Sequence, residues 1–331
     1  MTKISDTPAP ESADEATKAP AIIVRQTLRM LDAATSIELE ELDSIDYASH
    51  FMAQASLPLT EPKGSSYTRK NGNLELTIMP VALDLEGNGV KTLCYPYGVY
   101  PRLALIWIIS EAVRTGNPRV PLGRTINDFM TTLGLEGGGG ARVKEIRRQL
   151  LALFRCTLQV TSTDKIDGLT RDRLLSMTIT SEAELWTATS RSKRRRTAAV
   201  KRNTSAESWV ELSPTFFAKL QNNGTVPLDR RAVHALSRYA FALDIYTWAT
   251  WRVHVARGKD VRVAWTTLSK QFGADYKLTR QFKAAFLKNL ETRVKLVYPT
   301  LEYSSTTAYL TLHGSPTAVA KRVPKRVISK S

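Results

Sequence analysis

Two long apolar helical stretches, each followed by the same series of short elements, place the strongest limit on how this chain folds. Residues 99–114 are strongly apolar, and residues 238–255 carry apolar side chains on nearly every face of a helix. A helix of the second kind is usually buried at the centre of a domain. Each stretch is followed by a short strand, a short helix, a turn, a longer helix and a hairpin, which is the order of a winged helix. We therefore predict an α+β, mainly α fold of tandem winged helix-turn-helix domains with β-hairpin wings.

Capping residues support the boundaries within both series. Thr125 can cap a helix that runs to Leu133, with Asp128 in its first turn. The pair Ser213-Pro214 is typical of another helix start, an N-cap followed by proline. The other predicted helices cover residues 141–154, 265–272 and 278–293. The predicted strands are 74–78, 93–95, 120–122, 157–161, 174–180, 209–212, 226–228, 261–263, 294–301 and 306–312. The pair 157–161 and 174–180 forms a hairpin with a long polar tip, and 294–301 with 306–312 forms a second hairpin.

Composition divides the chain into five regions. Residues 1–66 are an acidic N-terminal region that we predict to be partly disordered, although apolar clusters within 21–60 predict one or two short helices. Residues 191–207 are a basic linker, in which seven of the twelve residues 191–202 are Lys or Arg. The predicted regions that complete the division are a first winged-helix domain at 67–190, a second at 208–314 and a basic C-terminal tail at 315–331.

The distribution of charge points to a polyanionic partner. The chain has 47 Lys+Arg and 31 Asp+Glu, a net charge of +16. Residues 1–66 hold 5 basic and 11 acidic side chains, a net of −6, so the rest holds 42 basic and 20 acidic, a net of +22. Such a body favours nucleic acid first and an anionic membrane second. The longest apolar run, Leu103 to Ile109, is far shorter than the ~20 residues of a membrane span, so we predict no membrane partner.

The predicted helix 141–154 has a core face and a basic face. Val143, Ile146, Leu150, Leu153 and Phe154 share one helical face. Its cations lie on the sides and on the opposite face, where Arg can hold a guanine with two hydrogen bonds and Lys can contact phosphate. The alternative is a solvated charged face, which is common on helices. The candidate DNA-binding residues here are Arg142, Lys144, Arg147 and Arg148.

The predicted helix 278–293 has a buried stripe and a chemically richer exposed face. The stripe consists of Leu278, Phe282, Ala285, Phe286 and Leu290. Arg280 and Gln281 lie in its first turn, where a recognition helix usually meets base edges. A mixture of Arg, Gln and Asn suggests base recognition in addition to charge attraction. The candidate residues are Lys277, Thr279, Arg280, Gln281, Lys283 and Lys288, and the basic linker adds Arg194, Arg195 and Arg196 as candidate phosphate contacts.

Signals for catalysis, metal or cofactors are weak. Cys94 and Cys156 lie far apart in the sequence, as two reduced cytosolic thiols would, and the four histidines show no metal-ligand spacing. The glycines at 137–140 lack the Lys-Ser/Thr that follows in a phosphate-binding loop. The N-terminus has no apolar signal-peptide region. We therefore predict a cytoplasmic protein that is not an enzyme and uses no cofactor and no metal.

Several blocks resemble the plasmid replication initiator RepA family, of the type that shares a RepA C-terminal region. They are residues 95–154, 210–229, 235–252 and 263–298, with the motifs PYGxxPRL, EAVRT, FMxxLGL, ALDxYxW and QFGxDY in order. The sequence departs from the family at Tyr239-Ala240, where the family often has Ser-Pro, and residues 1–66 align with nothing in it.

The resemblance implies a cytoplasmic plasmid protein that binds repeated sites in double-stranded origin DNA and promotes origin opening. It also implies recruitment of host replication machinery, with the host initiator and the replicative helicase as partners, a homodimer, and in some members repression of the protein's own gene. The alternative is a winged-helix transcriptional regulator without initiator activity. A nicking enzyme is a third class, which the missing histidine-metal motif disfavours.

Overall fold

The computed structural model describes residues 27–40, 42, 44–85, 87–135, 139–166, 169–186, 207–222, 224–273 and 276–319. Arg194, Arg195 and Arg196 of the predicted linker, and the basic part of the predicted C-terminal tail, lie outside these residues.

The elements follow one another in two series. A helix over residues 27–39 comes first. Next come β1 (Ile45–Ser49), α2 (His50–Gln54), β2 (Tyr67–Asn71), β3 (Leu74–Met79), β4 (Val81–Leu83), β5 (Thr92–Cys94), α3 (Val99–Thr115), β6 (Arg119–Gly123), α4 (Ile126–Thr132), α5 (Gly140–Arg155), β7 (Thr157–Ile166), β8 (Leu169–Thr178) and β9 (Thr180–Glu184). The second series is β10 (Ser208–Leu212), α7 (Pro214–Gln221), β11 (Thr225–Asp229), α8 (Arg230–Ala235), α9 (Ala240–Ala256), β12 (Val261–Ala264), α10 (Trp265–Phe272), α11 (Thr279–Asn289), the π-helical turn η1 (Leu290–Val294), α12 (Lys295–Val297), β13 (Tyr303–Ser305) and β14 (Tyr309–Leu312).

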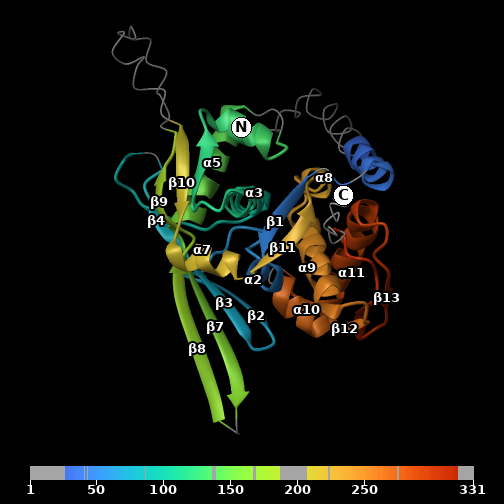
Figure 1. Cartoon of the computed structure of the whole chain (residues 1–331). Coiled ribbons are helices and arrows are strands. Elements are labelled where there is room, and N and C mark those ends of the chain that lie inside the picture. Colours follow the sequence, from blue (N-terminus) through green and yellow to red (C-terminus); the bar gives the residue numbers. More distant parts are fainter. Residues whose placement is uncertain are drawn as a thin grey trace, which may run out of the picture.

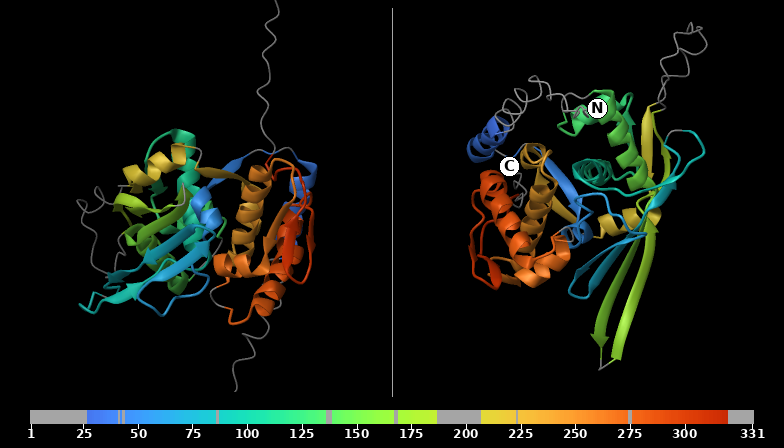
Figure 2. Two further views of the ribbon diagram at one scale, coloured as in Figure 1. Left: turned by 90° about the horizontal axis from the view of Figure 1, so that it is seen from below. Right: turned by 180° about the vertical axis from the view of Figure 1, so that it is seen from behind.

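Small antiparallel sheets surround the helices. Their strand orders are β2-β3-β7-β8, β6-β10-β9, β12-β14-β13, β1-β11 and β4-β5. The β7–β8 hairpin extends well beyond the body of the molecule (Figure 1). Figure 2 shows two bodies that lie side by side, one around α3 and one around α9. The first elements of the second series, β10 and α7, belong to the body around α3. The fold is thus a mixture of helices with small sheets.

The two predicted apolar helices are the centres of the two bodies. Helix α3 and helix α9 each bury most of their length, and α9 begins at Ala240, two residues after the predicted start. The caps are confirmed, because the Thr125 hydroxyl accepts the Asp128 N–H at 3.1 Å and the Ser213 hydroxyl accepts the Phe216 N–H at 3.3 Å. Local capping chemistry therefore fixes where α4 and α7 begin.

A buried ion pair joins the central helices. Arg102 of α3 donates from Nε and Nη2 to the two carboxylate oxygens of Asp244 in α9, both at 2.7 Å. The same guanidinium donates to the carbonyls of Leu57, Pro58 and Gly98. The side chains of Arg102 and Asp244 are only 4% and 12% exposed. The five donors of the guanidinium are therefore all satisfied, which offsets part of the cost of burying the two charges.

Strand pairing crosses the predicted region boundaries. Strand β1, within the predicted N-terminal region, pairs with β11, so that Ile45 lies opposite Asp229. The predicted short helices of residues 21–60 correspond to the helix at 27–39 and to α2. Strand β10 begins at residue 208, where the predicted second domain starts, yet it pairs with β6 and β9 of the first series. Residues 208–212 therefore share a sheet with strands of the predicted first domain.

Two predicted hairpins differ from the observed ones. The predicted strand at 294–301 is wrong, because η1 and α12 continue the helix to Val297 and the strand of the hairpin, β13, begins only at Tyr303. Val294 and Val297 are buried on the face that continues from Leu290, so burial overrides the strand preference of valine. The β7–β8 strands are also longer than predicted, since residues taken as a polar tip are strand. They are mostly exposed and therefore lack the apolar alternation that marks a half-buried strand.

Candidate nucleic-acid interface

Helix α11 is held by an aromatic core. Phe282 and Phe286 are fully buried. Both rings contact Trp265 and Phe241, and Phe286 also contacts Phe272, with ring centroids 5.6 to 6.4 Å apart. These rings pack α10 and α9 against one side of α11. Of the predicted stripe, Phe282, Phe286 and Leu290 are buried and Ala285 is half-buried, whereas Leu278 at the N-cap is 45% exposed. The buried residues fix the orientation of the opposite face of α11 toward solvent.

That opposite face carries most of the predicted contact residues. Residues 276–290 contain no Asp or Glu. The predicted residues that lie exposed on or just before α11 are Lys277, Thr279, Arg280, Gln281 and Lys288. The first turn of α11 therefore presents an arginine, an amide and a hydroxyl together, with positive charge at both ends of the helix.

Lys283 differs from these residues. It is half-buried, and its ammonium donates to the carbonyl of Thr306 at 2.7 Å and lies 5.4 Å from the centre of the Trp265 ring. Thr306 belongs to the turn between β13 and β14. Lys283 thus contacts the wing-like hairpin, a role that sequence spacing along the helix does not reveal.

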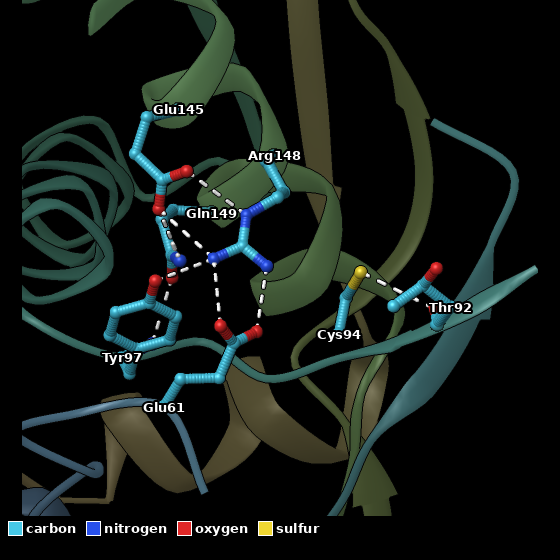
Figure 3. Close-up of polar contacts among 7 residues, drawn as sticks. All are labelled: Glu61, Thr92, Cys94, Tyr97, Glu145, Arg148 and Gln149. Atoms are coloured by element: carbon cyan, nitrogen blue, oxygen red, sulfur yellow. Dashed lines mark hydrogen bonds and ion pairs between the residues drawn. The ribbon is translucent and has the colours of Figure 1, made fainter. Parts of the chain in front are cut away.

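Helix α5 buries its predicted core face, and one of its predicted DNA-binding cations, Arg148, is hydrogen-bonded within the protein. The guanidinium of Arg148 donates to Glu61 at 2.7 Å, to Glu145 at 3.0 Å and to the hydroxyl of Tyr97 at 2.6 Å (Figure 3). Glu145 in turn accepts from the buried amide of Gln149 at 2.9 Å. The Arg148 side chain is 17% exposed, so these partners take up its hydrogen-bonding groups.

The charges of this network stabilise one another. Burial opposes the charged form of Arg148, but the hydrogen bonds that it donates to Glu61 and Glu145, with the charges of these carboxylates, outweigh burial and raise its pKa above the usual value. Burial raises the pKa of Tyr97, and the Glu145 carboxylate adds to that shift. The guanidinium therefore stays charged and paired, as expected of a structural cation.

The other predicted cations of α5 are distributed unevenly. Arg147 donates from Nε to the carbonyl of Trp186 at 3.2 Å, and Arg142 lies half-buried with its guanidinium 5.9 Å from the centre of the Tyr100 ring. Lys144 is exposed. Of the four cations predicted as contacts on α5, one is exposed, whereas three of the four cations predicted around α11 are exposed.

A polar cluster at the end of the β12-β14-β13 sheet was not found from the sequence. His313 lies between Asp260 and Ser304, with its Nδ1 3.0 Å from the carboxylate and its Nε2 2.9 Å from the hydroxyl. Asp260 also accepts the Gly314 N–H. Each residue belongs to a different strand end, so the cluster ties the three strands together. No sequence signal marks it, because Asp260 and His313 lie 53 positions apart.

The cysteines in the described part of the chain are not exposed. Cys94 and Cys156 are free and buried, and burial raises the pKa of Cys156 to about 12. No group of three His, Cys, Asp or Glu residues within the described ranges is placed to hold a metal ion. No helix among the same residues is long and apolar enough to span a membrane.

Comparison with known proteins identifies the family. A family model described as plasmid encoded RepA protein matches residues 95–269, which is more than half of the chain. The chain therefore belongs to this family of plasmid replication initiators, as its motifs predicted. A comparison with curated proteins finds no match.

Two solved structures of RctB domains 2 and 3 are also similar to the chain. The first has 13% sequence identity and a TM-score of 0.48, and the match covers 80% of this chain and 97% of that one. The second, a selenomethionine derivative, has 11% identity and a TM-score of 0.47, and the match covers 79% and 95%.

The family motifs lie mainly in the core. PYGxxPRL supplies Tyr97 to the Arg148 network and Arg102 to the buried ion pair. ALDxYxW supplies Asp244, the partner of Arg102, and Tyr246, whose hydroxyl accepts the Asp229 N–H at 3.0 Å. The motif residues named here therefore hold the structure together, and none of these contacts identifies a residue that binds a base.

Proposed function

We propose that this protein binds repeated duplex sites in plasmid origin DNA and that α11 is the recognition helix. The observation that carries the proposal is the exposed first turn of α11, where Thr279, Arg280 and Gln281 project from an aromatic core without any nearby carboxylate on the helix. Arg can hold guanine O6 and N7 together, and Gln can hold adenine N6 and N7. This set is suited to the major groove.

The topology around α11 supports a winged-helix assignment for the second body. The order α9, β12, α10, α11, β13 and β14 is that of the predicted domain, and β12 pairs with β14, which pairs with β13. We propose that the β13–β14 hairpin is the wing and that α11 enters the groove beside it.

We assign the first body a different contribution. Of the four contact residues predicted on α5, Lys144 is exposed, while Arg148 is paired with two carboxylates. We therefore leave Arg148 out of the proposed DNA surface and propose that α5 adds a weaker, phosphate-directed contact. The basic linker remains a proposed nonspecific contact.

We further propose that binding promotes origin opening and recruitment of the host initiator and replicative helicase, with a homodimer as one of its states. Membership of a replication initiator family supports this role over that of a regulator without initiator activity. The proposed role is one of binding in the cytoplasm and includes no chemical step and no cofactor.

A footprint on the DNA that flanks the gene tests the proposal. The full-length protein should protect repeated sites, and the Arg280→Ala/Gln281→Ala variant should lose that protection while still binding nonspecifically at low salt. Arg171→Ala, which removes an exposed arginine from β8, is the matched control and should leave the footprint intact. Equal protection by wild type and the double variant would show that α11 is not the recognition helix.

A further inference from the structure

The turn between β13 and β14 is tied to the helix pair by three hydrogen bonds. The backbone N–H of Trp265 donates to the Ala308 carbonyl at 3.0 Å, and its indole Nε1–H donates to the Thr306 carbonyl at 3.1 Å. The ammonium of Lys283 donates to that same Thr306 carbonyl at 2.7 Å. One carbonyl of the turn therefore accepts a donor from α10 and another from α11.

Both donors are themselves held in place. Trp265 is 2% exposed, and its ring packs against Phe286 with centroids 5.6 Å apart. A buried indole N–H needs an acceptor, which the Thr306 carbonyl provides. The Lys283 ammonium lies 5.4 Å from the Trp265 ring centre, within the range of a cation–π contact. Lys283 is thus fixed by a carbonyl and by a ring face.

The turn is closed by its own hydrogen bonds and faces solvent. The Thr306 N–H donates to the Tyr309 carbonyl at 2.9 Å, and the Tyr309 N–H donates to the Thr306 hydroxyl at 3.1 Å. Residues 304–308 are exposed. Because the turn is rigid and is attached to Trp265 and Lys283, its position relative to the first turn of α11 is set by these two side chains.

We propose that Lys283 is a positioning residue, which holds the β13–β14 turn beside α11 through the Thr306 carbonyl and does not contact DNA phosphate. The inference rests on the proposed function and gives Lys283 a different role from the direct DNA contact that was predicted from the sequence. The part of the wing that meets the DNA backbone is then the uncharged turn itself. The ammonium reaches phosphate only by giving up both the carbonyl and the ring.

The test compares Lys283→Met with Lys283→Gln in the full chain. Methionine removes both the hydrogen bond and the charge, and we expect it to weaken specific binding about threefold to tenfold, the range of one net hydrogen bond. Glutamine keeps an N–H donor without the charge and should stay within about twofold of wild type. The slope of log affinity against log salt should be unchanged in both variants, since no phosphate contact is lost.

A phosphate contact would behave differently. Both variants would then weaken binding equally, and each would reduce the magnitude of the salt slope by about 0.9. That result, or full affinity in Lys283→Met, would overturn the inference. Lys288→Ala, which removes an exposed cation from the same helix, provides the reference for a lost phosphate contact.

Trp265→Phe gives an independent measurement. It removes the other donor to the Thr306 carbonyl without a change in charge, so it should weaken specific binding at constant salt slope. Because Trp265 and Lys283 act on one acceptor, the double variant should deviate from additivity, and additive losses would count against the inference. The proposed function fails separately if Arg280→Ala binds as wild type, whatever the Lys283 variants do.

Discussion

Helices α5 and α11 occupy corresponding places, because the order α3, β6, α4, α5 is repeated as α9, β12, α10, α11, yet they differ in what surrounds their cations. On α5, Arg148 is enclosed by Glu61, Glu145 and Tyr97. On α11, Arg280 and Lys288 project into solvent, and the helix itself contains no carboxylate. A similar count of basic residues in the sequence thus corresponds to a structural network in one body and to an open surface in the other.

The difference teaches that the placement of carboxylates, more than the number of cations, separates a binding helix from a structural one. A guanidinium that already holds two carboxylates must lose those bonds before it can hold a phosphate or a base. An exposed arginine has no such cost beyond its hydration and side-chain entropy. The comparison therefore predicts separable effects on stability and on DNA binding.

The largest expected effect concerns the link between the two bodies. Asp244→Ala leaves the Arg102 charge buried without its partner, and we expect a loss of about 3–5 kcal/mol in the free energy of unfolding. Chemical denaturation measures it. Glu75→Ala, which breaks the exposed pair with Lys70, is the control and should cost less than about 1 kcal/mol. Similar losses in the two variants would mean that the buried pair does not join the bodies energetically.

The next effect is on binding by α11. Arg280→Ala should reduce the affinity for the specific site by about 1–3 kcal/mol and relax base preference at one position. Its free energy of unfolding should stay close to that of wild type, because the side chain is exposed. Competition binding with base-substituted duplexes measures both quantities. A uniform loss across all duplexes would instead assign Arg280 to the phosphate backbone.

Arg148→Ala should show the opposite pattern. Its removal breaks hydrogen bonds to Glu61 and Glu145, and because those carboxylates are partly exposed we expect a cost of about 1–2 kcal/mol in stability. The affinity of the folded variant for specific DNA should stay within about twofold of wild type. Such a change is smaller than the loss of about 1–3 kcal/mol expected when a base contact is removed. Thermal unfolding and footprinting check the two halves of this prediction. Loss of DNA binding at unchanged stability would erase the contrast between α5 and α11.

The smallest effects sharpen the comparison through salt dependence. Lys288→Ala and Lys144→Ala each remove one exposed cation, and each should reduce the magnitude of the salt slope by about 0.9 if both helices contact phosphate. A change in Lys288→Ala alone would restrict duplex contact to the second body. Binding isotherms at several salt concentrations distinguish these outcomes.

Much of the fold followed from local pattern, and its failures have identifiable reasons. Strongly apolar stretches predicted the helices α3 and α9, apolar periodicity predicted α5 and α11, and the hydroxyls of Thr125 and Ser213 marked two helix starts. The segment at 294–297 was mistaken for a strand because valine favours strands, while burial beside Leu290 decided for helix. Strand β1 was missed because its pairing partner lies in β11, far along the chain.

The candidate site divides in the same way. Sequence alone determined that α11 has a buried aromatic stripe and a basic, amide-bearing opposite face, because both depend only on the 3.6-residue period. Tertiary structure decided which cations are free, since the carboxylate of Glu61 lies 87 positions from Arg148 and the Thr306 carbonyl 23 positions from Lys283. Hydrogen bonds and ion pairs act over a few ångströms in space, so a chain position by itself carries no record of them.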